Sequence, residues 1–117
     1  MSETDVKKAI TDALEAHGYI VTRTTASGYR GRTAGCKKGT PDLHVQGHHG
    51  RSVWLEIKAT EKDKATQGQV AFIGKARSFG AYAAVVWTPE QAEKRMRNAA
   101  EFRSMSKDWA YFGDEPV

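Results

Sequence analysis

The sequence contains a single cysteine, Cys36, and no long apolar run. One cysteine cannot form an internal disulfide, so we expect a protein of the reducing cytoplasm. A membrane-spanning helix needs roughly 18 to 20 consecutive apolar residues, and no stretch approaches that length. The N-terminal segment carries acids where a signal peptide has its apolar part, which favours an amphipathic helix. For Cys36, a spectator thiol in a basic loop is favoured over a catalytic nucleophile.

Internal repeats, low-complexity tracts and linker-like shifts in composition are also missing. We therefore expect residues 1–117 to form one domain with a single modest core. The sequence lacks the GxxxxGK[ST] loop that holds nucleotide phosphates, which argues against a hydrolase of small phosphorylated substrates. No small-molecule cofactor is expected.

Positive charge is concentrated in the middle of the chain, although the net charge of +4 is modest. Residues 1–20 hold four acids against two lysines, whereas residues 21–60 hold two acids against seven basic side chains. Four of those seven lie in the glycine-rich segment 26–39, namely Arg30, Arg32, Lys37 and Lys38. This pattern favours contact with a polyanion such as DNA, since each neutralised phosphate releases condensed counterions. A solvated basic surface is the alternative that charge alone leaves open.

Hydrophobic periodicity predicts the element order α-β-β-β-α-β-α. The expected elements are a helix stopped by Gly18, a strand Tyr19–Thr25, a hairpin within residues 39–59, a helix from the Thr66 capping box to about Gly80, a buried strand 81–87 and a helix from Pro89 to about Arg103. The second helix is expected to turn inward Val70, Phe72, Ile73 and Ala76. This order predicts an α/β fold with a small mixed β-sheet flanked by helices.

The hairpin has a register that its apolar residues determine. Residues two apart in a strand share a face, and a slip of one residue would expose an apolar face. Pairing Leu43 with Leu55 and Val45 with Val53 brings the two apolar faces together. That register leaves a three-residue loop, residues 48–50, in which Gly50 can adopt the left-handed conformation.

The same register places two acids, Asp42 and Glu56, directly opposite each other, roughly 5 Å apart at Cβ. Like charges paired across strands destabilise a sheet unless something neutralises them. Lys58 on the same face offsets one charge, and a divalent cation would offset both. Two carboxylates with a main-chain carbonyl form the oxygen-rich site that Mg²⁺ or Mn²⁺ prefers. A carboxylate pair held only by ordinary salt bridges is the alternative.

Such a cation would polarise a phosphate oxygen and lower the pKa of a bound water. Lys58 could orient that water or stabilise charge that develops on the phosphate. His44, His48 and His49 suggest zinc, but two of them lie at the tip of the turn, away from Asp42. We expect those two to be solvent-exposed turn residues.

The motifs Pro41-Asp42 and Glu56-Ile57-Lys58 resemble those of the PD-(D/E)XK nuclease superfamily. A fuller set is similar to its VRR-NUC branch, the virus-type replication-repair nuclease domain: an early acid on an amphipathic helix, then "KGTPDL", "VWLEIK", "TQGQVAFI" and "GAYAAVVW". The resemblance covers roughly residues 3–88 and extends to small stand-alone members carried by phages. It implies a PD-(D/E)XK nuclease-like core in a protein of a bacterial or phage-infected cytoplasm.

The resemblance also implies roles for particular residues. Asp42 and Glu56 would be metal ligands, the Ile57 carbonyl would complete the protein ligands, and Lys58 would be the catalytic lysine. The cofactor would be Mg²⁺ or Mn²⁺.

Two further positions each have more than one interpretation. Gln69 matches a glutamine of this branch that points towards the site, and it is equally the capping-box residue of its helix. The early acid is Glu3, as a further metal ligand, with Glu15 as the fallback. An acid that complements the helix dipole is the other interpretation of Glu3.

The implied activity is a metal-dependent, structure-selective DNA endonuclease in replication, repair or recombination. Branched DNA such as a four-way (Holliday) junction is the expected substrate, cut by a homodimer whose two-fold symmetry matches it. Flap or single-strand cleavage, or DNA binding without cleavage, are the alternatives. The chain has more apolar side chains than its core is expected to need, and these could line the dimer interface: Val85, Val86, Trp87, Trp109, Tyr111 and Phe112.

Overall fold

The computed structural model describes residues 1–24 and 39–101 of the 117-residue chain. Its elements are α1 (Glu3–Ala16), β1 (Ile20–Arg23), β2 (Leu43–Gln46), the 3-10 turn η1 (His48–Gly50), β3 (Ser52–Ile57), α2 (Gln67–Ser78), β4 (Tyr82–Val86) and α3 (Pro89–Glu101). The predicted α-β-β-β-α-β-α order is confirmed, with η1 as a short turn inside the hairpin. Within the described part of the chain, every helix is too short or too polar to span a bilayer.

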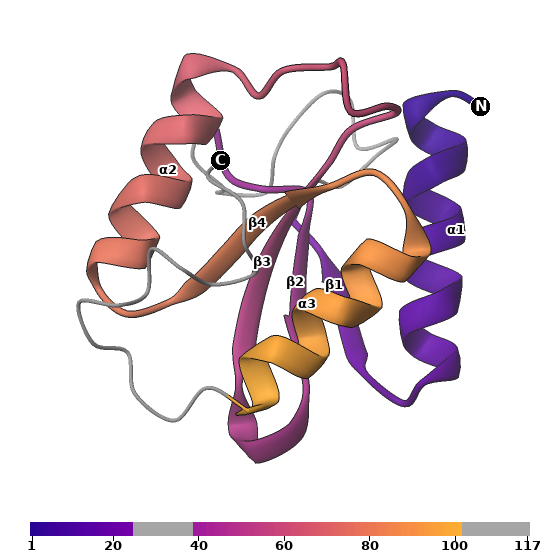
Figure 1. Ribbon diagram of the computed structural model, residues 1–117, viewed down its shortest axis with the longest axis vertical. Helices are drawn as coiled ribbons and strands as arrows, with labels where there is room; N and C mark the ends of the chain where they lie inside the picture. Colours follow the sequence, from indigo (N-terminus) through magenta and orange to yellow (C-terminus); the bar gives the residue numbers. More distant parts are fainter. Residues whose placement is uncertain (25–38, 102–117) are drawn as a thin grey trace.

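The four strands form one mixed sheet in the spatial order β1-β2-β3-β4 (Figure 1). β1, β2 and β3 pair antiparallel, and β4 joins β3 in parallel after a crossover through α2. A parallel pair needs a long connection, which explains why a helix stands between β3 and β4. The mixed α/β fold expected from the sequence is the fold observed.

The helices cover both faces of this sheet. Apolar side chains of α1 and α3 share one core cluster with the strands, and its large members include Ile10, Leu14, Leu43, Leu55, Ile57, Tyr82 and Met96. On the other face, the ring of Phe72 in α2 meets the ring of Trp54 edge-on at 5.2 Å between centroids. Arg77 of α2 is buried and donates through Nε to the Ala83 carbonyl at 2.9 Å. These contacts hold α2 over β3 and β4.

The hairpin has the predicted register. Leu43 pairs with Leu55 and Val45 with Val53, and all four side chains are fully buried. Gly50 has φ +71°, the left-handed conformation that a three-residue loop requires at its end. The burial of both apolar faces therefore fixes how β2 and β3 align.

Three helix ends lie where the sequence predicts them. Gly18 follows α1 with φ +90°, and the Thr88 hydroxyl accepts from Gln91 N at the start of α3. At the start of α2, the Thr66 hydroxyl accepts from Gln69 N, and the Gln69 side chain accepts from Thr66 N. Reciprocal capping of this kind satisfies two backbone donors that the helix cannot satisfy itself.

Two local predictions were wrong. Val70 was expected to face inward, but its side chain is 45% exposed. The inward stripe of α2 runs instead at four-residue spacing through Gln69, Ile73 and Arg77, so polar contacts decide its orientation. The first strand is also shorter than its apolar pattern, since β1 spans Ile20–Arg23.

The apolar residues at the end of β4 and directly after it differ in burial. Val86 is fully buried, and Val85 and Trp87 are partly buried. Val86 therefore cannot supply apolar area for a dimer, while the expectation for Val85 and Trp87 stays a prediction. Trp109, Tyr111 and Phe112 lie outside the described residues, as does the expected helix end at Arg103.

Two glycines bring the start of β2 against the start of α2. Gly39 has φ +91°, and a Cβ built there would lie 2.6 Å from the Gly68 carbonyl oxygen. An alanine in place of Gly68 is easily accommodated, because its Cβ would lie 3.7 Å from Gly39 Cα, an ordinary contact. Only Gly39 must therefore be glycine for the two backbones to approach so closely.

This asymmetry gives a stability prediction. Gly39→Ala combines a left-handed backbone with a backbone clash, so it should lower the free energy of unfolding by at least about 2 kcal/mol. The matched variant Gly68→Ala should be neutral or stabilising by up to about 1 kcal/mol, since alanine favours a helix over glycine. Urea denaturation measures both. Equal effects of the two substitutions would contradict this account of the contact.

Candidate active site

The predicted site lies where β3 ends, on the sheet face that α2 covers. Leu55 and Ile57 point into the core, so Glu56 and Lys58 point to the opposite face. Both polar side chains are almost completely enclosed, with 1% of Glu56 and 7% of Lys58 exposed. The Lys58 backbone N–H donates to the Val86 carbonyl at 3.0 Å, which keeps this residue in line with the strand.

Asp42 approaches from the neighbouring strand. It directly precedes β2, and the register of Leu43 with Leu55 continues to place it opposite Glu56. Asp42 Oδ2 accepts a hydrogen bond from Ile57 N at 2.9 Å. The two acids are therefore brought together as the sequence predicts, and a backbone hydrogen bond fixes the orientation of one.

Gln69 connects the helix to both charged residues of β3. Its Nε2 donates to Glu56 Oε2 at 2.8 Å, and its Oε1 accepts from Lys58 Nζ at 3.1 Å. The same Oε1 accepts from Thr66 N at 2.8 Å as part of the capping box. The same Gln69 side chain therefore caps α2 and points towards the site, where it contacts Glu56 and Lys58.

Lys7 is a site residue that the sequence analysis missed. Its Nζ lies 3.1 Å from Asp42 Oδ1, and only 19% of its side chain is exposed. A signal was present, since Lys7 continues the helical stripe of Ile10 and Leu14 at spacings of three and seven. A lysine at the end of an apolar stripe that packs on the sheet is placed at the edge of that sheet.

The Glu56 carboxyl is electrostatically strained. Burial, and next the nearby Asp42 charge, raise the pKa of Glu56 from 4.5 to about 8, although Lys58 opposes both effects at 3.3 Å. Glu56 Oε1 is buried and receives no hydrogen bond from the described residues. This raised pKa favours the protonated form of Glu56, in which its carboxyl hydrogen-bonds to the Asp42 side chain.

The oxygen atoms of this site are suitable ligands for a hard divalent cation. Ile57 N points towards Asp42, and the Ile57 carbonyl lies on the same edge of β3, because Lys58 N points the other way to β4. The two carboxyls and this carbonyl supply oxygen ligands only, as Mg²⁺ or Mn²⁺ prefers. A cation would also relieve the repulsion between the acids and give Glu56 Oε1 a partner. The residues present fit such an ion.

The other predicted ligands are not joined to this pair. Residues 1–24 and 39–101 contain no group of three or more His, Cys, Asp or Glu that could hold a metal. Glu3 is exposed one turn before Lys7, so its ligand role stays a prediction. Glu15 is exposed two turns beyond Lys7, towards the other end of α1. The predicted basic contacts and the free thiol lie outside the described residues: Arg30, Arg32, Lys37, Lys38 and Cys36.

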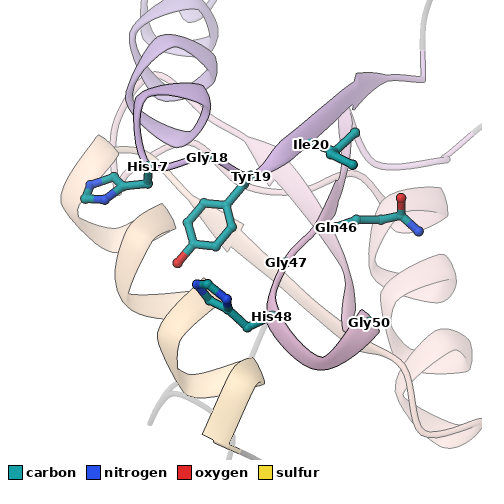
Figure 2. Close-up of a pocket in the computed structure, with 8 residues that line it drawn as sticks. All are labelled: His17, Gly18, Tyr19, Ile20, Gln46, Gly47, His48 and Gly50. Carbon is teal, nitrogen blue, oxygen red and sulfur yellow. The ribbon is translucent and has the colours of Figure 1, made fainter.

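The described histidines do not approach the carboxylates. His44 packs on Trp54 at 4.6 Å between ring centroids, and His48 is exposed in the turn. His17, Tyr19 and His48 line a pocket of about 330 Å³ at the opposite end of β2 (Figure 2). This pocket contains none of the residues predicted to act in the site.

Comparison with known proteins gives one structural match. No family model and no curated protein matches the chain. A solved structure described as a VRR-NUC domain superposes with a TM-score of 0.64 and 26% sequence identity. The match covers 83% of this chain and 97% of the other. The resemblance inferred from the sequence motifs is therefore confirmed at the level of three-dimensional structure.

The raised pKa of Glu56 predicts a dependence of stability on pH. Between about 4.5 and about 8, the folded protein holds a proton that the unfolded chain has released. The contribution of Glu56 to the free energy of unfolding is therefore greatest below the lower value and is lost as pH rises through the upper one. In urea denaturation with a chelator present, Glu56→Gln should gain stability relative to the wild type across this interval.

Glu61→Gln provides the control for that experiment, because Glu61 is an exposed acid in the loop after β3. Its stability difference from the wild type should be constant over the same pH range. A constant difference for Glu56→Gln as well would show that the Glu56 carboxyl is not strained.

Proposed function

We propose that this VRR-NUC-like chain is a divalent-metal-dependent DNA endonuclease that hydrolyses phosphodiester bonds. The structural match supports a nuclease-type function in general. The observation that carries the proposal is the pair of facing carboxyls, partly exposed Asp42 and buried Glu56, in which Glu56 Oε1 accepts no hydrogen bond from the described residues. A pair this strained is retained at a cost in stability, which a catalytic role accounts for.

In the proposed reaction each polar residue has a separate task. Mg²⁺ or Mn²⁺, when bound, would polarise a phosphate oxygen of the substrate and lower the pKa of a bound water. Asp42, Glu56 and the Ile57 carbonyl would hold that ion through their oxygen atoms. Lys58 is kept on the same face by Glu56 and Gln69, and its ammonium stabilises negative charge that develops on the phosphate.

The proposed substrate is branched DNA, with a four-way junction first and a homodimer as the cutting unit. This part rests on the resemblance to small stand-alone VRR-NUC domains and on the match between two-fold enzyme and two-fold substrate. Flap or single-strand cleavage is the alternative for the same site. Cleavage of labelled junction, flap, duplex and single-stranded DNAs with Mg²⁺ or Mn²⁺ distinguishes these substrates.

Replacement of either acid tests the catalytic assignment. Asp42→Asn and Glu56→Gln should abolish cleavage in that panel, while DNA binding stays near normal or tightens because a negative charge is removed. Asp12→Asn is the matched control, since Asp12 is an exposed acid of α1 paired with Lys8. Cleavage that survives in either site variant would refute the assignment of that residue.

Lys58→Ala should slow the chemical step rather than weaken metal binding. One preorganised charge donor is worth roughly 2 to 4 kcal/mol of transition-state stabilisation, so the single-turnover rate should fall by about 30-fold to 1,000-fold. Calorimetry should show Mn²⁺ affinity close to that of the wild type. Loss of metal binding in a folded variant would contradict the proposed role.

The basic segment is proposed to contact phosphates. Replacing Lys37 and Lys38 together with alanine should weaken binding to all DNA sequences and reduce the log–log salt slope by about two units. Fluorescence anisotropy at several salt concentrations measures the slope. An unchanged slope, or a large fall in melting temperature, would favour a structural role for these lysines.

A further inference from the structure

Two adjacent lysines of α1 have opposite environments. Lys8 is 71% exposed and forms an ordinary (i, i+4) ion pair with Asp12. Lys7 is 19% exposed, and its ammonium reaches across to Asp42, whose own side chain is 14% exposed. The Lys7–Asp42 pair is therefore largely shielded from water, and a partial loss of solvent strengthens the attraction between its charges.

The four oxygens of the two acids have unequal partners. Asp42 Oδ2 accepts from the Ile57 backbone, and Glu56 Oε2 accepts from Gln69 and faces the Lys58 ammonium. Glu56 Oε1 receives no hydrogen bond from the described residues. Asp42 Oδ1 pairs with the Lys7 ammonium, and the Asp42 side chain also has a hydrogen-bond contact with the Glu56 carboxyl. A divalent cation held between the two acids would therefore share Asp42 with the positive charge of Lys7.

We propose that Lys7 is an exchangeable counter-ion of the site, which competes with the divalent cation for Asp42. This inference rests on the metal site of the proposed function and assigns a role to a residue outside the predicted motifs. The Lys7 ammonium neutralises Asp42 while the metal is absent. A cation held by Asp42 would repel the ammonium and weaken its ion pair, so that Lys7 would be available to pair with a phosphate.

Release of Lys7 couples metal binding to nucleic-acid binding. A phosphate gives the released ammonium a new partner, so bound DNA should favour the metal-bound arrangement. Because such coupling is reciprocal, the metal should strengthen DNA binding by the same factor. Without Lys7, this part of the coupling disappears.

The first test measures Mn²⁺ affinity by calorimetry without DNA, in a buffer above the Glu56 pKa. Lys7→Met removes the competing charge and keeps the length of the side chain, so Mn²⁺ should bind about five- to tenfold more tightly than in the wild type. Lys8→Met removes the same charge from the same helix and should leave the affinity within about twofold. Lys7→Gln should behave like Lys7→Met, and circular dichroism verifies that each variant is folded.

The second test adds a short DNA duplex with non-hydrolysable phosphate linkages. The wild type and Lys8→Met should bind Mn²⁺ more tightly when this DNA is present. Lys7→Met should show at most half of that gain on a logarithmic scale. An equal gain in all three proteins would overturn the proposed coupling.

The outcomes separate this inference from the proposed function. Weaker or unchanged Mn²⁺ binding in the folded Lys7 variants would mean that Lys7 merely supports Asp42, and the inference would fail even if the wild type cleaves DNA. Tighter Mn²⁺ binding in a protein that cleaves none of the DNAs would uphold the competition and count against the nuclease.

Discussion

Two carboxyl groups that face each other across the β2–β3 ladder impose the main constraint on this structure. Burial, and next the nearby Asp42 charge, raise the pKa of Glu56 to about 8. Each has a lysine within ion-pairing distance, Lys7 for Asp42 and Lys58 for Glu56. A lysine from α1 and another directly after β3 thus offset the charge of the two acids, which helps the sheet to accommodate both.

The surrounding fold serves to keep that arrangement in place. Core burial of Leu43 and Leu55 fixes the register that sets the acids opposite each other. The close contact of Gly39 with Gly68 then brings the start of α2 to the same place, so that Gln69 reaches Glu56 and Lys58. A polar site of this kind needs several elements to be correct at once, because its residues come from α1, the start of β2, the end of β3 and the start of α2.

The sequence predicted those parts of the site that follow from short-range periodicity. Alternation along β3 separates Glu56 from Leu55, and the hairpin register follows from which residues are apolar. The Lys7 contact could not be obtained in this way, because it depends on how α1 docks on the sheet and not on the helical period alone. The orientation of α2 was misjudged at Val70 for a related reason, since buried Arg77 and Gln69 make polar contacts that outweigh one exposed valine.

The central claim is that the facing acids hold a divalent cation between them. Anomalous scattering from crystals grown with Mn²⁺ locates that ion without relying on activity. The account predicts a single strong peak within about 2.0 to 2.6 Å of carboxyl oxygens of both Asp42 and Glu56, with Lys7 Nζ withdrawn from Asp42 Oδ1. A peak bound elsewhere on the protein, with the Lys7–Asp42 ion pair intact, would contradict it.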